Sequence, residues 1–184
     1  GVLHKEGPSA ESQRDGGRTH GLQLWVNLPA AEKMTTPAYQ DLRAASVPRH
    51  ELPGATVRVI AGDLFELHGP GSTHTPISYA HVTLAAGATV STALPSGHVV
   101  LVYPLTGSLT IAGESVAEAT LAVVGGGDTL TFTGGADSSE VIVLTGEPLG
   151  EPVARMGPFV MNTQAELRQA MVDFDHGRFG SPTD

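Results

Sequence analysis

Short apolar segments, each closed by glycine, proline or another small turn residue, are the feature that most constrains the fold of this chain. They follow one another at a spacing of roughly ten residues between positions 54 and 146. In the first of them, Val57 and Val59 alternate with Thr56, Arg58 and Ile60, which is the two-residue period of a strand. The segments are ATVRVIAG, ISYAHVTLAAG, ATVSTALP, HVVLVYPLTG, SLTIAG, ATLAVVGGG, DTLTFTGG and SEVIVLTG. Many short strands with regular turns predict an antiparallel sandwich or barrel, so we expect an all-β fold.

The sequence before this region is less regular. Residues 9–19, SAESQRDGGRT, are polar and predict a loop. The stretch GLQLWVNLP predicts a strand that ends at Pro29, with apolar side chains at every second position: Leu22, Leu24, Val26 and Leu28. Residues 30–53 contain three prolines and no sustained period, which indicates an extended linker.

The C-terminal region predicts a helix. Thr163 and Glu166 have the spacing of a capping box, in which each side chain satisfies a free backbone N–H of the first turn. Gly177 is suited to end the helix, so we expect the one substantial helix near residues 163–176. An apolar stripe on this helix must pack on another element: Leu167, Ala170, Met171 and Phe174.

Composition excludes several classes of function. The formal net charge of −9 and the scattered basic residues argue against direct binding of nucleic acid. The chain has no cysteine, which excludes disulfides, thiolate metal sites and a cysteine nucleophile. The sequence contains no run of eighteen apolar residues, so it predicts no membrane-spanning helix. We expect a cytoplasmic protein. The Ser/His/Asp order, the phosphate-binding glycine loop and the HExxH pattern are all missing from the sequence.

The first seven residues, GVLHKEG, contain a candidate metal-binding pair, His4 and Glu6. On a strand, alternate side chains share one face with Cα atoms about 7 Å apart, so both could reach one ion. The composition predicts about one such pair by chance. The spacing alone therefore does not decide whether the two residues bind a metal or are simply exposed to solvent.

Two long stretches resemble the pirin family: HGLQLWVNLPAAEKMTTPAYQ at residues 20–40 and GEPVARMGPFVMNTQAELRQAMVDFDHGRFG at residues 150–180. The resemblance implies a bicupin, two similar β-barrels face to face, of which this chain carries the C-terminal half with a C-terminal helix. It implies remnant strands of the N-terminal metal-binding cupin at residues 1–40, an interdomain linker at 41–53 and a C-terminal cupin domain at 54–184.

The resemblance also implies an iron site of three histidines and one glutamate. His4 and Glu6 match the last histidine and the glutamate, whereas the other two histidines belong to an earlier HxH strand that this sequence does not contain. We therefore expect a partial site for Fe, or for another divalent metal, that is weak in this chain alone. His98 stands where a second cupin motif would begin, but Val100 and Val102 cannot ligate, so the second barrel is expected to be metal-free.

Two functions are compatible with the resemblance. One is a quercetin-type dioxygenase in which Glu6 both ligates and acts as a base toward a flavonol hydroxyl. The other is a non-catalytic regulatory protein that binds a transcription factor or a metabolic enzyme, with the metal incidental or lost. We also expect the apolar strand at residues 22–28 to pair with an N-terminal fragment or a second copy of the chain, which would complete the first barrel.

Overall fold

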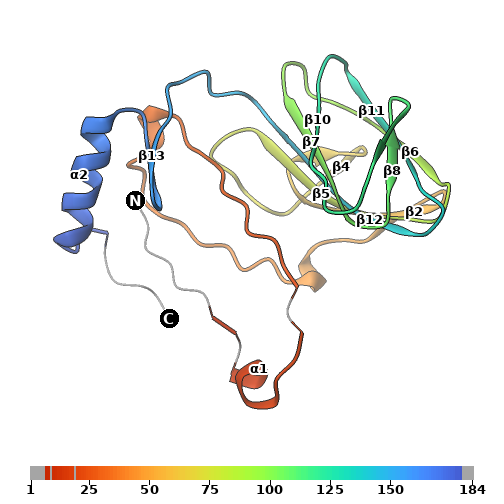
Figure 1. Ribbon diagram of the computed structural model, residues 1–184, viewed down its shortest axis with the longest axis horizontal. Coiled ribbons are helices and arrows are strands. Elements are labelled where there is room, and N and C mark those ends of the chain that lie inside the picture. The colour runs from red at the N-terminus through yellow and green to blue at the C-terminus, as the bar shows by residue number, and fades with distance from the viewer. Residues whose placement is uncertain (1–6, 9, 19, 180–184) are drawn as a thin grey trace. The chain divides into compact units, whose positions relative to one another are not determined.

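The computed structural model describes residues 7–8, 10–18 and 20–179, without the side chain of Glu11 (Figure 1). The chain divides into two compact units. Residues 40–148 form one unit, which we call the barrel unit, and residues 1–39 together with 149–184 form the other, which we call the terminal unit. In the described part of the chain, no helix combines the length and the apolar character needed to cross a membrane.

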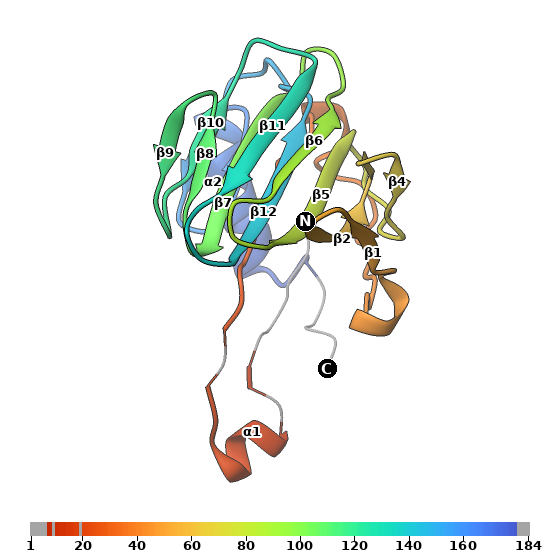
Figure 2. The ribbon, with the colours of Figure 1, turned by 90° about the vertical axis from the view of Figure 1, so that its right-hand side faces the viewer.

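The barrel unit contains a six-stranded antiparallel sheet and a four-stranded antiparallel sheet (Figure 2). The larger sheet has the order β1 (His50–Leu52), β2 (Ala55–Ala61), β5 (Ile77–Leu84), β12 (Ser139–Gly146), β7 (Val99–Thr106) and β10 (Ala122–Val124). The smaller sheet has the order β6 (Thr89–Ala93), β11 (Thr129–Gly134), β8 (Leu109–Ile111) and β9 (Glu114–Val116). The all-β, cupin-type prediction for this region is confirmed.

Alternating side chains from both sheets fill the core of the barrel unit. Strand β2 buries Ala55, Val57, Val59 and Ala61 and leaves the residues between them partly exposed, as the two-residue period predicts. One continuous apolar cluster joins the sheets, with the largest fully buried side chains Phe132, Leu84, Leu109 and Leu130 among its members. Val100 and Val102 belong to this cluster, so the positions that follow His98 are packing positions.

A short hairpin, β3 (Asp63–Leu64) and β4 (Leu67–His68), contributes buried side chains to this core. Its two turn residues, Phe65 and Glu66, both have positive φ, at 55° and 60°. Such a turn favours glycine or asparagine, and here the Phe65 ring is buried while Glu66 is exposed. The Phe65 backbone N–H donates to the Thr92 hydroxyl at 2.7 Å, which fixes the turn against strand β6.

The two ends of the barrel unit are tied to the same loop. The Gln40 side chain donates to the Ser72 carbonyl at 2.8 Å and accepts from the Ser72 backbone N–H at 2.9 Å. The Glu147 backbone N–H donates to the Pro76 carbonyl at 3.3 Å. The chain therefore enters and leaves this unit within a few residues of one loop.

The terminal unit is built around helix α2 (Gln164–Asp175) and the hairpin of β13 (Ala154–Met156) and β14 (Phe159–Met161). The predicted helix is confirmed together with its capping box: the Thr163 hydroxyl accepts from the Glu166 N–H, and the Glu166 carboxylate accepts from the Thr163 N–H. Gly177 follows the helix with φ of 67°. Helix α2 contacts both strands of the hairpin.

Two local predictions are wrong. Residues 10–15 form a short helix, α1 (Ala10–Asp15), within the stretch predicted as a loop. Residues 21–28 form no strand, because the described chain offers them no neighbouring strand to complete a ladder. The predicted linker at 30–53 holds η1 (Ala30–Glu32), η2 (Ala44–Ser46) and, at its end, β1, which joins the six-stranded sheet. The domain boundaries expected from the sequence stay a prediction.

Candidate functional site

The predicted metal ligands, His4 and Glu6, lie outside the described residues. Among the residues that are described, no three histidine, aspartate or glutamate side chains gather in a way that could hold a metal ion. The described part of the chain therefore does not fit a metal centre by itself.

Three of the five histidines in the barrel unit lie close to a side chain of a neighbouring strand or of the same hairpin. The His98 ring lies 3.2 Å from the Thr145 hydroxyl, and the His68 ring lies 2.8 Å from the Asp63 carboxylate. His81 projects from the outer face of β5, with Nε2 3.7 Å from Glu140 Oε2. These contacts are pairwise and join residues of neighbouring strands or one hairpin, which is what a structural role predicts.

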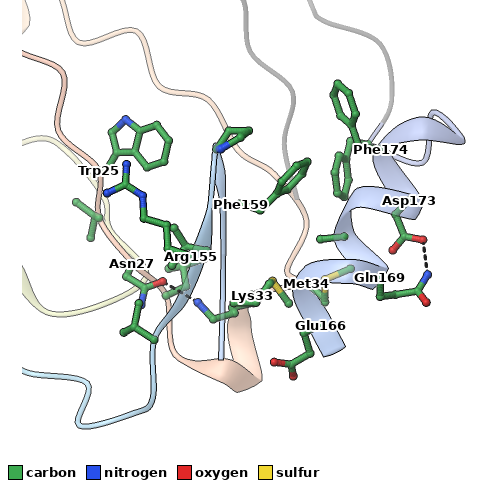
Figure 3. A pocket seen from close by; sticks show the side chains of 18 residues that line it. Trp25, Asn27, Lys33, Met34, Arg155, Phe159, Glu166, Gln169, Asp173 and Phe174 are labelled. Atoms are coloured by element: carbon green, nitrogen blue, oxygen red, sulfur yellow. Dashed lines mark hydrogen bonds between the residues drawn. The ribbon is translucent and has the colours of Figure 1, made fainter. Parts of the chain in front are cut away.

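The terminal unit contains a pocket of about 960 Å³ (Figure 3). Its walls come from residues 25–34, from the β13–β14 hairpin and from helix α2 with the turn that follows it. The apolar lining residues are Trp25, Val26, Leu28, Met34, Val153, Pro158, Phe159, Val160, Met161, Ala170, Phe174 and Phe179. The segments that meet here are separated by the whole barrel unit in sequence.

Three phenylalanine rings form one wall. The ring centroids of Phe159 and Phe174 are 5.9 Å apart in an edge-to-face arrangement, and Phe179 lies 6.3 Å from each. Because Phe159 lies on β14 and Phe174 on α2, this cluster holds the helix against the hairpin. Phe174 remains 48% exposed, so the cluster still presents an apolar edge to solvent.

Trp25 and Arg155 form the opposite side of the pocket. The Arg155 guanidinium carbon lies 5.5 Å from the Trp25 ring centroid, a cation–π arrangement that Figure 3 shows. Nearby, the Lys33 ammonium donates to the Asn27 side-chain carbonyl at 2.6 Å. The Trp25–Arg155 contact joins this segment to the hairpin, and the Lys33–Asn27 hydrogen bond links its two ends, although the segment has no strand ladder of its own.

Glu151 connects the two halves of the terminal unit. Its Oε2 accepts from the Ala30 backbone N–H at 2.7 Å and from the Asn162 side-chain nitrogen at 2.8 Å. One carboxylate thereby joins the start of η1 to the end of β14.

Two carboxylates on helix α2 have lowered pKa values. The pKa of Glu166 is lowered mainly by the hydrogen bond from the Thr163 hydroxyl, with further help from the backbone N–H groups of Thr163 and Asn162 and from the charge of Lys33. The pKa of Asp173 is lowered mainly by the hydrogen bond from Gln169, and then by Arg178. Both groups are held ionised, which suits them to stabilise the helix and not to act as acids near neutral pH.

The residues that line this pocket are suited to binding. Its lining is mostly apolar and aromatic, and its polar groups are already engaged in contacts within the unit. The sequence analysis missed the pocket, although it singled out the helix stripe that contains Phe174. The aromatic residues Trp25 and Phe159 were an available signal, but nothing in the sequence placed them in one pocket.

Comparison with known proteins gives a consistent family signal. Residues 79–180 match the family described as the Pirin C-terminal cupin domain. A Pseudomonas aeruginosa protein named "Putative quercetin 2,3-dioxygenase" is 41% identical over 181 residues, which are 97% of this chain and 63% of that protein. Human pirin is 37% identical over 185 residues, which are 98% of this chain and 62% of that protein.

The fold comparison agrees. The crystal structure of a quercetin 2,3-dioxygenase from Acinetobacter baumannii superposes with a TM-score of 0.81 at 36% identity, covering 86% of this chain and 56% of that one. The chain thus spans less than two thirds of the length of these relatives.

Proposed function

The chain belongs to the pirin family of cupin proteins, and on that basis we propose that it forms the larger part of an iron-dependent dioxygenase acting on quercetin-like flavonols. The observation that carries this proposal is the 41% identity to the Pseudomonas aeruginosa relative across 97% of the chain. The 36% identical Acinetobacter baumannii structure supports it, because that protein bears the same activity in its name.

In such an enzyme the barrel unit would have a structural role and would not contain the active site. Its interior is filled by apolar side chains such as Val82, Val102 and Phe132, none of which can bind a metal or move a proton. The chemistry would then fall to the N-terminal residues, where the family resemblance assigns ligand positions.

His4 and Glu6 are the residues of this chain that would take part. A catalytic metal site usually has at least three protein ligands, so one imidazole and one carboxylate do not make a complete site, and further ligands would have to come from polypeptide beyond these residues. When bound, iron would supply Lewis acidity and dioxygen chemistry. This chain would contribute the general base, the Glu6 carboxylate, which would accept the proton of the flavonol hydroxyl.

The test is a family-length protein in which the missing ligands are present. Iron content, dioxygen uptake and loss of quercetin are measured for the unmodified protein and for His4→Ala, Glu6→Gln and His98→Ala. We expect His4→Ala to lose iron and activity and Glu6→Gln to lose activity, whereas the control His98→Ala keeps both. Stoichiometric iron without quercetin turnover in the unmodified protein would contradict the proposal.

A second candidate is a regulatory protein that acts by binding a transcription factor or a metabolic enzyme. The apolar pocket favours it, because such a surface is suited to protein contact and carries no free acid–base group. A family-length protein that binds such a partner with equal affinity with and without iron, and does not turn over quercetin, would support this candidate over the enzyme.

A further inference from the structure

The β3–β4 hairpin connects the two sheets of the barrel unit and forms a separate two-stranded sheet of its own. On one side, the Ser78 hydroxyl accepts from the Asp63 backbone N–H at 3.2 Å and donates to the Asp63 carbonyl at 3.0 Å. On the other side, the Phe65 backbone N–H donates to the Thr92 hydroxyl at 2.7 Å. Ser78 lies on β5 of the larger sheet and Thr92 on β6 of the smaller one, so these hydrogen bonds hold the hairpin between the sheets.

The hairpin lies at the end of the barrel where the core is partly polar. Ser78 is the second residue of β5, and Thr145, the next-to-last residue of β12, is its cross-strand neighbour. Thr92 is the next-to-last residue of β6. All three side chains are buried next to a cluster of apolar residues. Buried hydroxyls need hydrogen-bond partners, and the hairpin backbone supplies them to Ser78 and Thr92.

The turn of this hairpin is strained. Phe65 and Glu66 both lie in the left-handed region, which residues other than glycine adopt at an energetic cost. The stem consists of Gly62, with φ of 65°, and Gly69, whose N–H donates to the Gly62 carbonyl at 2.9 Å. Glycine allows the stem a wide range of conformations. The buried Phe65 ring and the hydrogen bonds therefore favour the closed hairpin, whereas the strain in its turn opposes it.

We propose that residues 62–69 form a hinged flap over a binding site for a small aromatic molecule that carries a hydroxyl group. When the flap opens, the Phe65 ring leaves an apolar slot of its own shape, and the hydroxyls of Ser78 and Thr92 lose their backbone partners. A ligand of this class replaces both, because its ring fills the slot and its hydroxyl bonds to the freed oxygens. The site uses no residue of the proposed dioxygenase chemistry, so it does not depend on that function.

Hydrogen exchange tests the opening. In the unmodified chain, the bonded amides of Asp63 and Phe65 are expected to exchange about a hundredfold faster than the amides of β5, because the flap opens without unfolding of the barrel. Thr92→Val removes the acceptor of the Phe65 N–H and should accelerate exchange of the Asp63 amide about tenfold, although Thr92 does not bond to Asp63. Thr110→Val, at an exposed position of the smaller sheet, is the matched control and should leave this amide unchanged.

Phenol is the probe for the ligand. In the unmodified chain, phenol should accelerate exchange of the Asp63 amide in proportion to its concentration, because a ligand that binds the open flap raises the population of that state. In Phe65→Ala the slot is vacant, so phenol should bind at least about tenfold more tightly than to the unmodified chain. Adding Thr92→Val to Phe65→Ala should weaken phenol about tenfold and leave toluene, which lacks the hydroxyl, within about twofold.

Three results would overturn the proposal. Exchange of the Asp63 amide as slow as that of β5 would mean that the hairpin opens only when the barrel unfolds. Equal acceleration in Thr92→Val and Thr110→Val would mean that the Thr92 hydroxyl does not hold the flap. Phenol that leaves the exchange of the unmodified chain unchanged would exclude the ligand site, and this result decides the matter alone if Phe65→Ala does not fold.

Discussion

Replacing Leu167 by alanine should release helix α2 from the hairpin on which it packs. Leu167 is fully buried, and it is the one large side chain with that property in the described part of the terminal unit, where the other buried apolar residues are Ala154 and Ala170. The substitution removes three carbon atoms, about 2.4 kcal/mol of transfer free energy, and the cavity left behind raises the cost to about 3 kcal/mol or more.

This loss is large for an element of 12 residues. Helices shorter than about 12–15 residues are marginal in water, so α2 depends on its packing and should unfold when that packing is lost. The expected signal is an increase of about a hundredfold in the hydrogen-exchange rate of the α2 amides, which corresponds to about 3 kcal/mol. Amides in β5 and β12 should be unaffected, because Leu167 is not part of the barrel core cluster.

Val172→Ala is the matched control, since Val172 lies on the same helix but is 44% exposed. It should change the exchange of α2 amides less than tenfold. The reasoning would be refuted if Leu167→Ala also changed them less than tenfold, or if it accelerated exchange in the barrel core to the same extent as in α2.

Three further predictions concern stability. Hydrogen bonds lower the pKa of Glu166, so its carboxylate cap stabilises α2 fully at pH values above the ordinary pKa of 4.5, and this stabilisation is lost as the pH falls through the lower folded-state pKa. Glu166→Gln should remove this pH dependence from the circular dichroism of the helix, and an acid transition that is the same in the variant would contradict the prediction. Glu66→Gly should stabilise the barrel unit by about 0.5 kcal/mol in urea denaturation. The substitution removes the strain of a positive φ at a non-glycine residue, about 1–2 kcal/mol, which outweighs the backbone entropy cost of glycine, about 0.5–1 kcal/mol. A lower urea midpoint in the variant would contradict this prediction. Phe132→Ala should destabilise the barrel unit by about 3–5 kcal/mol, and a loss below about 1.5 kcal/mol would mean that the core collapses around the site.

The barrel strands and the capped helix could be predicted because their signals are local. Strand β2 shows its buried face directly in the alternation of Val57 and Val59 with polar neighbours, and the box of Thr163 and Glu166 sets the start of α2 within one turn. Residues 22–28 carry an equally clear alternation and yet form no strand. A strand needs a partner, and the partner is not encoded in the segment itself.

The candidate site could not be predicted for a related reason. The Trp25–Arg155 contact joins residues 130 positions apart, and neither residue has a local signature of binding. The predicted pair His4 and Glu6 is recognisable only through the family resemblance, since its spacing alone is as common as chance. The apolar stripe of α2 predicted that the helix packs on another element, but not that Phe174 would stay half exposed at the edge of a pocket.

The common anchoring of both ends of the barrel unit, through Gln40 to Ser72 and through Glu147 to Pro76, implies an order of folding. The bond between Ala30 and Glu151 closes a loop with a sequence separation of 121 residues, which costs about 4 kcal/mol in chain entropy if the chain between them is unfolded. Once the barrel has folded, only roughly ten flexible residues remain in that loop, and the cost falls to about 2 kcal/mol. Prior folding of the barrel therefore lowers the entropic cost of assembling the terminal unit, which favours a barrel-first order of folding.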